Sequence, residues 1–181
     1  MKKKGFALIL AAALLVVGVV GGTMAWLTDK TDPVVNTFST SDIKVELTET
    51  EETYKMIPGH TIHKDPVAKV LANSEDCYLF VKLEKSANFD NYMEFTMAEG
   101  WTALPNVAGV YYREVSSARD DQSFPVLDNN TVTVKGTVTK AMMETAKTAN
   151  PTLTITAYAS QLHKNASADF EPAEAWANIP R

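Results

Sequence analysis

The chain has 181 residues, 45% of them hydrophobic and 22% charged, a composition typical of a folded globular protein rather than a disordered or fibrous one. Its formal net charge of −5 at pH 7 disfavours contact with phosphate backbones, so we expect no nucleic-acid partner. The single cysteine, Cys77, has no second cysteine with which to form an internal disulfide, so stability has to come from a buried core.

The N-terminus has the pattern of a secretion signal. Lys2, Lys3 and Lys4 precede an apolar run from Phe6 to Val20. Positive charge before such a run keeps that end of the chain in the cytoplasm. Gly21-Gly22 then disfavours continuation of the helix, and Thr23-Met24-Ala25 is a small-x-small sequence suited to signal peptidase. We therefore expect residues 1–25 to be a signal peptide.

Cleavage is expected between Ala25 and Trp26. The alternative is an uncleaved membrane anchor, because the uncharged stretch from Gly5 to Leu27 is long enough to span about 30 Å of hydrocarbon as a helix. Both interpretations place the rest of the chain outside the cytoplasm. Contact with a membrane is then expected only through this segment.

The residues around this boundary resemble those of one family of exported proteins. The sequence from Gly21 to Asp29 resembles the signal-peptide boundary of substrates of the SipW-type signal peptidase. The stretches Thr31–Phe38 and Asp42–Leu47 look like the start of the mature proteins of that group, which includes the TasA and camelysin (CalY) biofilm-matrix proteins of Gram-positive bacteria. The resemblance implies a jelly-roll-like β-sandwich, residence on the cell surface or in extracellular fibres, and the SipW-type peptidase as a partner during export.

Alternation of apolar and polar residues predicts one antiparallel β-sandwich domain over residues 34–181, preceded by a mature extension over residues 26–33. The predicted strands are Val34–Thr40, Asp42–Thr48, Val67–Leu71, Cys77–Glu84, Met93–Met97, Val110–Val115, Thr131–Thr139 and Leu153–Ser160. Clusters of turn-forming residues separate them. One short internal helix is expected over Ala141–Thr148, before Asn150-Pro151, and a helical turn over Glu171–Ala177.

An N-terminal strand is the predicted means of self-association. Val34, Val35, Thr37 and Phe38 have high β-propensity, and such a segment can pair with the open sheet edge of a neighbouring molecule. The family resemblance also implies assembly by lending an N-terminal strand. The alternative is that this segment forms the first strand of its own domain.

Histidines offer weak candidates for a metal site. His60 and His63 flank Thr61-Ile62, but zinc needs three or four ligands and His163 is the only other histidine. The neighbouring Pro58-Gly59 and Asp65-Pro66 predict a loop. Camelysin has been associated with metalloprotease activity, yet no catalytic motif matches here. We therefore predict no cofactor and no enzymatic role.

Other chemically suggestive residues have ordinary structural interpretations. Cys77 begins a strong strand and is predicted to be a small buried hydrophobe, with Glu75 and Asp76 raising its pKa if they lie close. Calcium could bind the oxygen-rich loops Asp120-Asp121 and Asp128–Asn130, although they lack EF-hand spacing. Solvated acidic loops are the commoner case.

Aromatic residues near the strands allow two interpretations. Either they pack across strands, or they form an exposed patch that binds a polysaccharide or protein. These residues are Tyr78, Phe80, Tyr111 and Tyr112. Trp101 and Trp176 are expected to cap the core.

Taken together, the sequence predicts an exported structural protein of the cell surface or biofilm matrix. Self-association or binding to other matrix proteins is its expected interaction. The alternatives are a camelysin-like metalloprotease and a surface binding module.

Overall fold

A computed structural model describes residues 42–51 and 53–180, which lie in the second of two compact units, Thr40–Arg181. Most of the regular structure described there is β. In chain order the elements are β1 (Val45–Thr48), β2 (Thr61–His63), β3 (Val67–Val70), β4 (Cys77–Lys85), α2 (Phe89–Tyr92), β5 (Met93–Glu94), β6 (Thr102–Ala103), β7 (Val110–Val115), β8 (Gln122–Pro125), a 3-10 turn η1 (Asp128–Asn130), β9 (Thr131–Val134), α3 (Lys140–Ala146), β10 (Leu153–Gln161), β11 (His163–Asn165), β12 (Ala168–Asp169) and α4 (Pro172–Ala177).

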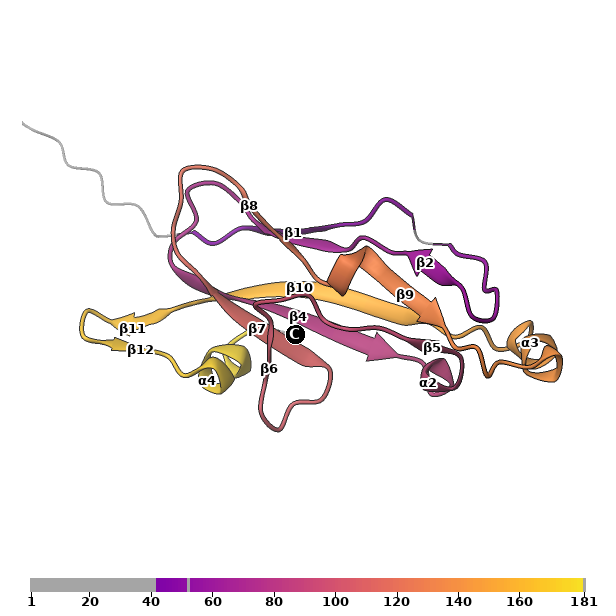
Figure 1. The fold of residues 1–181 in the computed structure, drawn as a ribbon. Coiled ribbons are helices and arrows are strands. Elements are labelled where there is room, and N and C mark those ends of the chain that lie inside the picture. The colour runs from indigo at the N-terminus through magenta and orange to yellow at the C-terminus, as the bar shows by residue number, and fades with distance from the viewer. Residues whose placement is uncertain (1–41, 52, 181) are drawn as a thin grey trace, which may run out of the picture. The chain divides into compact units, whose positions relative to one another are not determined.

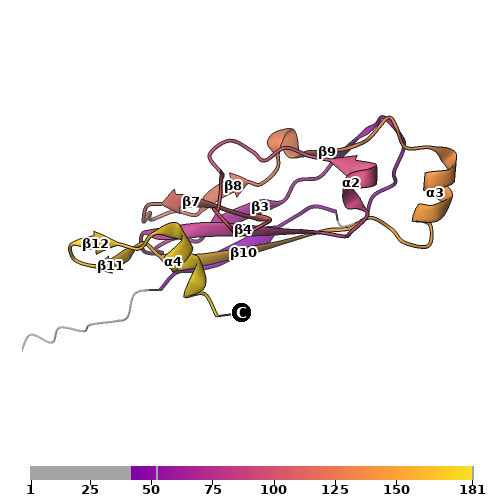
Figure 2. The same ribbon diagram turned by 90° about the horizontal axis from the view of Figure 1, so that it is seen from below.

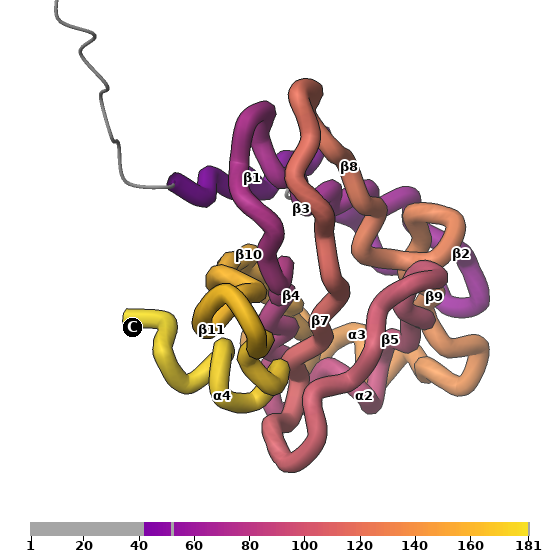
Figure 3. Tube along the Cα trace, turned by 90° about the vertical axis from the view of Figure 1, so that its left-hand side faces the viewer, coloured from indigo at the N-terminus to yellow at the C-terminus, as the bar shows by residue number. Residues whose placement is uncertain are grey.

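The strands form two antiparallel layers (Figures 1 and 3). One layer is the sheet β10-β4-β7-β6. The other combines the sheets β1-β3-β8 and β2-β9-β5, which continue into one another. Two backbone hydrogen bonds, from Lys64 N to the Asn130 carbonyl and from Val126 N to the Pro66 carbonyl, join them at 2.8 and 2.9 Å. The antiparallel all-β sandwich predicted from the sequence is confirmed.

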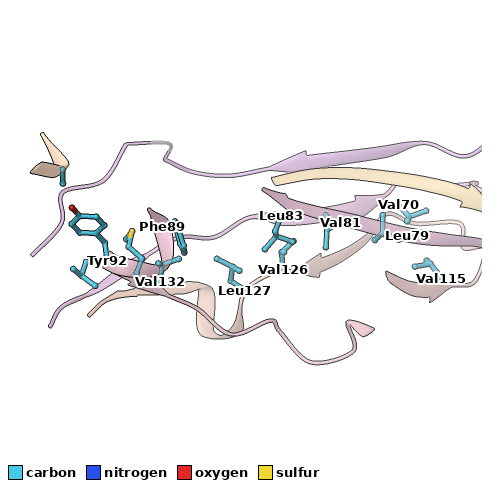
Figure 4. Packing of buried hydrophobic residues seen from close by; sticks show 14 of the residues in the cluster. Val70, Leu79, Val81, Leu83, Phe89, Tyr92, Val115, Val126, Leu127 and Val132 are labelled. Carbon is cyan, nitrogen blue, oxygen red and sulfur yellow. The ribbon is translucent and has the colours of Figure 1, made fainter. Parts of the chain in front are cut away.

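The main core fills the space between the two layers (Figure 4). Leu79, Val81 and Leu83 project into it from alternate positions of β4. They meet side chains from the opposite layer that are equally buried: Val70, Val126, Leu127 and Val132. Burying an aliphatic side chain of this kind contributes about 1.5–3 kcal/mol, so this layer contact is the main source of stability.

A second core lies on the opposite face of the β10-β4-β7-β6 sheet. Tyr78 and Phe80 of β4 point to this face and are only 4% and 0% exposed. Trp176 of α4 packs on Phe80 with ring centroids 5.2 Å apart and on the edge of Tyr158 at 5.3 Å. Strand β4 is therefore buried on both faces from Cys77 to Val81, which removes the polar positions that usually mark an exposed face.

The cover of this second core is a segment we call the C-terminal strap, residues 162–180, containing β11, β12 and α4 (Figure 2). Proline at the first position of α4, Pro172, supplies a helical φ without losing a hydrogen bond. Ala175 and Trp176 form the buried side of this helix. The helical turn predicted over Glu171–Ala177 is confirmed.

Most predicted elements are present with shifted ends. The internal helix is confirmed as α3, whose N-cap Thr139 accepts a hydrogen bond from Met142 N. The strand predicted over Thr131–Thr139 ends at Val134, because the chain turns at residues 136–137 and Val138 N donates to the Lys135 carbonyl at 3.2 Å. The prediction of one strand over Met93–Met97 is wrong in detail, since only a single bridge at Met97 follows β5. The signal peptide, the 26–33 extension and the Val34–Thr40 strand lie outside the described residues.

Arg113 stands on the core-facing side of β7, where an apolar residue would be usual. Its guanidinium carbon lies 4.0 Å from the centre of the Phe124 ring and 5.5 Å from that of Trp101. Its Nε is buried with no hydrogen-bond partner among the described residues, and burial lowers the pKa of the group. Leaving a buried donor unpaired costs free energy that the cation–π contacts offset.

We expect Arg113→Met to leave the free energy of unfolding within about 1 kcal/mol of the parent, because methionine keeps the packing and removes the unpaired donor. Arg113→Ala should cost about 2 kcal/mol through lost packing. Urea denaturation of both variants measures the difference. A larger loss for methionine than for alanine would contradict this account of Arg113.

Candidate functional site

The histidine pair does not form a metal centre in the part of the chain that the structure describes. Residues 61–63 form β2, paired with Thr131–Thr133 of β9, so the predicted loop is wrong at these positions. Ile62 turns inward, while His60 and His63 are exposed. Among the described residues, no group of three or more His, Cys, Asp or Glu side chains is placed to hold a metal ion.

Cys77 is fully buried in the main core, as predicted for a small hydrophobe. Burial raises the pKa of its thiol to about 11, and the neighbouring charge of Asp76 acts in the same direction. A thiol with such a pKa is a poor nucleophile at neutral pH. Cys77 is therefore a packing residue.

The side chains of the oxygen-rich loops are engaged in hydrogen bonds within the fold. Asp121 accepts a hydrogen bond from Ala72 N at 2.8 Å. Asp128 accepts one from the Asn129 side-chain amide at 3.0 Å, within a turn where Asn129 and Asn130 have positive φ. Both loops thus have a structural role that explains their composition.

The aromatic residues do not form an exposed patch. Tyr78 and Phe80 are buried under the C-terminal strap, and Tyr112 joins them in the second core, whereas Tyr111 packs against the main core. Cross-strand packing, the first of the two interpretations, is confirmed. Trp101 packs against the main core and donates to the Pro125 carbonyl at 2.8 Å, and Trp176 caps the second core.

The feature that stands out as a candidate interaction site is the outer edge of β10. This strand has nine residues, Leu153–Gln161, and pairs with β4 in an unbroken register. On its other side, no strand of the described part of the chain pairs with it. A row of unpaired N–H and C=O groups of this length is a template for another strand.

The sequence and register of β10 have none of the charges, prolines or bulges that usually protect an edge strand from pairing with another molecule. β10 contains no lysine, no other charged residue and no proline, and its register has no bulge. The other edge strands of these three sheets are short: β1, which includes Glu46, and β8 have four residues each, β2 has three, and β5 and β6 have two each. β10 is therefore the long unprotected edge within the described residues.

A cleft of about 420 Å³ opens at the start of β10. Leu153 and the residues just before it line one side, and most of the rest of the lining comes from the segment 53–56, from α2 and from β2, β5 and β9. Its apolar lining comprises Met56, Ile62, Phe89, Met93, Val132 and Leu153. A strand added at β10 would pass beside a hollow able to accept an apolar side chain.

The predicted donor residues Val34, Val35, Thr37 and Phe38, and the cleavage site Ala25-Trp26, lie outside the described residues. Within the described ranges, no helix is long and apolar enough to cross a membrane. No protein-family model, curated protein or solved structure matches the chain. The function therefore has to be argued from the residues themselves.

Proposed function

We propose that the protein is an exported structural component of the cell surface or extracellular matrix, which self-assembles by adding a strand from one molecule to the outer edge of β10 in the next. The observation that carries the proposal is the long, uncharged and bulge-free edge of β10. The N-terminal signal pattern and the resemblance to SipW-dependent matrix proteins supply the exported location.

The donor in this proposal is the N-terminal segment Val34–Phe38. As a strand, this segment would place Val34 and Phe38 on one face and Val35 on the other, and the cleft beside Leu153 offers a place for one of these side chains. Backbone hydrogen bonds supply affinity in strand addition, and pockets for alternate side chains supply specificity. Assembly would then be head to tail, which produces open filaments rather than closed dimers.

We expect the double variant Thr154→Lys, Thr156→Lys to weaken assembly. The threonines lie on β10 opposite Glu84 and Lys82 of β4. Since Thr156→Lys places two lysines opposite each other, circular dichroism first checks that the variant folds. Lysine on an edge strand opposes pairing with a further strand. The concentration needed for assembly should rise at least about tenfold, the equivalent of about 1.4 kcal/mol. Sedimentation and electron microscopy of protein recovered from the cell exterior measure it.

The matched control is Thr137→Lys, which adds positive charge at an exposed threonine in the turn after β9. This variant should assemble like the parent. Deletion of Val34–Phe38 should abolish assembly while leaving the β10 edge intact. Equal assembly of the parent and the double-lysine variant would refute β10 as the acceptor. Absence of the protein from the surface and matrix fractions would refute the proposed location.

A further inference from the structure

An imidazole bridges two carboxylates where the C-terminal strap meets the sheet. His163 Nε2 lies 3.0 Å from Asp76 Oδ2, and its Nδ1 lies 2.6 Å from Asp169 Oδ1. The two carboxylates approach opposite nitrogens of the ring, so they do not converge on a common metal position. We call His163, Asp76 and Asp169 the histidine clasp.

The clasp connects three separate parts of the fold. His163 begins β11 and Asp169 ends β12, so this contact closes the hairpin of the strap. Asp76 immediately precedes β4, and its other oxygen accepts from Ser117 N at 2.6 Å, in the segment after β7. Leu162 N also donates to the Asp76 carbonyl at 3.0 Å. Asp76 is thus fixed to the sheet, and His163 attaches the hairpin to it.

The hydrogen-bond chemistry of the clasp depends on the charge of the ring. Ionised carboxylates only accept hydrogen bonds, and a neutral imidazole has one N–H donor while an imidazolium has two. Both contacts can be hydrogen bonds only when His163 is protonated. In the neutral ring, one nitrogen lone pair faces a carboxylate oxygen. The hairpin contact at 2.6 Å is the shorter, so the proton of a neutral ring is expected to stay on Nδ1, and the contact with Asp76 is lost.

We propose that protonation of His163 docks the strap hairpin onto Asp76, and that deprotonation releases the hairpin from the sheet. The clasp is independent of assembly at β10. It would make the covering of the aromatic second core sensitive to the acidity of the surroundings.

The charges around the clasp fix the pH range in which it holds. Hydrogen bonds to Asp169 and then Asp76 raise the pKa of His163, so the clasp is present below the ordinary histidine pKa and is lost as pH rises through the raised value. The bonds from Ser117 and then His163 lower the pKa of Asp76, so that contact persists until pH falls through the lowered value. The clasp therefore holds at mildly acidic pH.

Other charged groups of the strap leave this range unchanged. Lys164, next to His163, pairs with Glu174 of α4 at 2.5 Å. The charges that act on His163 are those of Asp169 and Asp76. Tyr78 of β4 holds the Phe170 carbonyl at 2.9 Å, and Trp176 stays packed on Phe80. Release should therefore loosen the hairpin first, with α4 held by its aromatic contacts.

The test is hydrogen exchange at the hairpin as a function of pH, with histidine titrations followed by NMR on the purified chain. We expect His163 to titrate above the ordinary histidine pKa, because Asp169 and Asp76 raise its pKa. As pH rises through the His163 pKa, exchange of the Leu162 and Phe170 amides, corrected for intrinsic rates, should become about two- to tenfold faster. In His163→Gln, the neutral side-chain amide cannot become charged. Exchange of the hairpin amides should therefore be fast at all pH values.

The control His60→Gln alters an exposed histidine of similar chemistry and should keep the pH step of the parent. Asp76→Asn should abolish the step while the hairpin contact of Asp169 remains. The proposal is overturned if hairpin exchange shows no step across the His163 titration, or if His163→Gln retains the parent's step. These readouts do not depend on whether the molecule assembles.

Discussion

Phe80→Ala is expected to lower the free energy of unfolding by about 3–5 kcal/mol, the usual cost of removing a fully buried phenylalanine ring. The Phe80 side chain is completely inaccessible to solvent, and its ring packs against those of Trp176 and Tyr112. Its loss leaves a cavity between the sheet and α4 that neither side can fill. Because domains of this size are stable by about 5–15 kcal/mol, the change removes a large share of the total. Urea denaturation followed by tryptophan fluorescence measures it.

Phe80→Leu is the matched variant, since it retains most of the apolar volume and should cost less than about 1.5 kcal/mol. A second control removes the partner: Trp176→Ala should destabilise comparably, and the double variant should cost less than the sum because the two rings share one contact. Full additivity, or a loss below about 1 kcal/mol for Phe80→Ala, would show that α4 does not pack on the sheet in solution.

Gly109→Ala is expected to lower the free energy of unfolding by about 3 kcal/mol or more, which is the second large effect. The φ of Gly109 is +73°, a conformation that costs an ordinary residue about 1–2 kcal/mol. A Cβ at this position would lie 2.5 Å from the Leu83 carbonyl oxygen, while Leu83 N donates to the Gly109 carbonyl at 2.7 Å. The turn before β7 therefore approaches the backbone of β4 too closely for any side chain, and the strand would have to move.

Two other glycines separate the conformational cost from the clash. Gly59 has a similar φ of +78°, but its nearest neighbour to an added Cβ is Gly136 Cα at 4.0 Å. Gly59→Ala should thus cost only about 1–2 kcal/mol. Gly136 has nothing within 4 Å, so Gly136→Ala should change stability little. In thermal unfolding, the loss of stability should be largest for Gly109→Ala, smaller for Gly59→Ala and smallest for Gly136→Ala. Equal losses at Gly59 and Gly109 would argue against the close approach to Leu83.

The fold was largely predictable because its longest strands carry long local patterns. Strand β7 has the predicted bounds, and β4 and β10 each extend one residue beyond their predicted C-terminal ends. The elements that sequence reasoning missed are short. β2, β6 and β8 have four residues or fewer, too few for an alternation to be recognised, and they depend on partners far along the chain.

The histidine interpretation failed for the same reason. Thr61–His63 follows a proline–glycine turn and reads as a loop, yet backbone pairing with β9 makes it a strand. No local signal in three residues reveals a partner about seventy residues away. The clasp at His163 was equally hidden, since Asp76 and His163 meet only through the β4–β10 pairing.

The candidate assembly edge had a signal that sequence reasoning did not use. The alternation over Leu153–Ser160 predicts a strand, but nothing in the alternation connects its lack of charged residues with its position in the sheet. A central strand is already paired on both sides, so a lack of charge there is ordinary. In an edge strand, a lack of charge leaves the strand open to pairing with another molecule. Only the sheet order, which places β10 outermost, distinguishes the two cases.

The covering of the second core by residues 162–180 has a consequence for folding. If β4, β7 and β10 pair before these residues dock, Tyr78, Phe80 and Tyr158 form a bare aromatic surface beside the β10 edge. Partly folded chains with exposed apolar faces and open edges are the species that aggregate. A folding intermediate with an undocked strap is therefore the species of this chain most prone to aggregation.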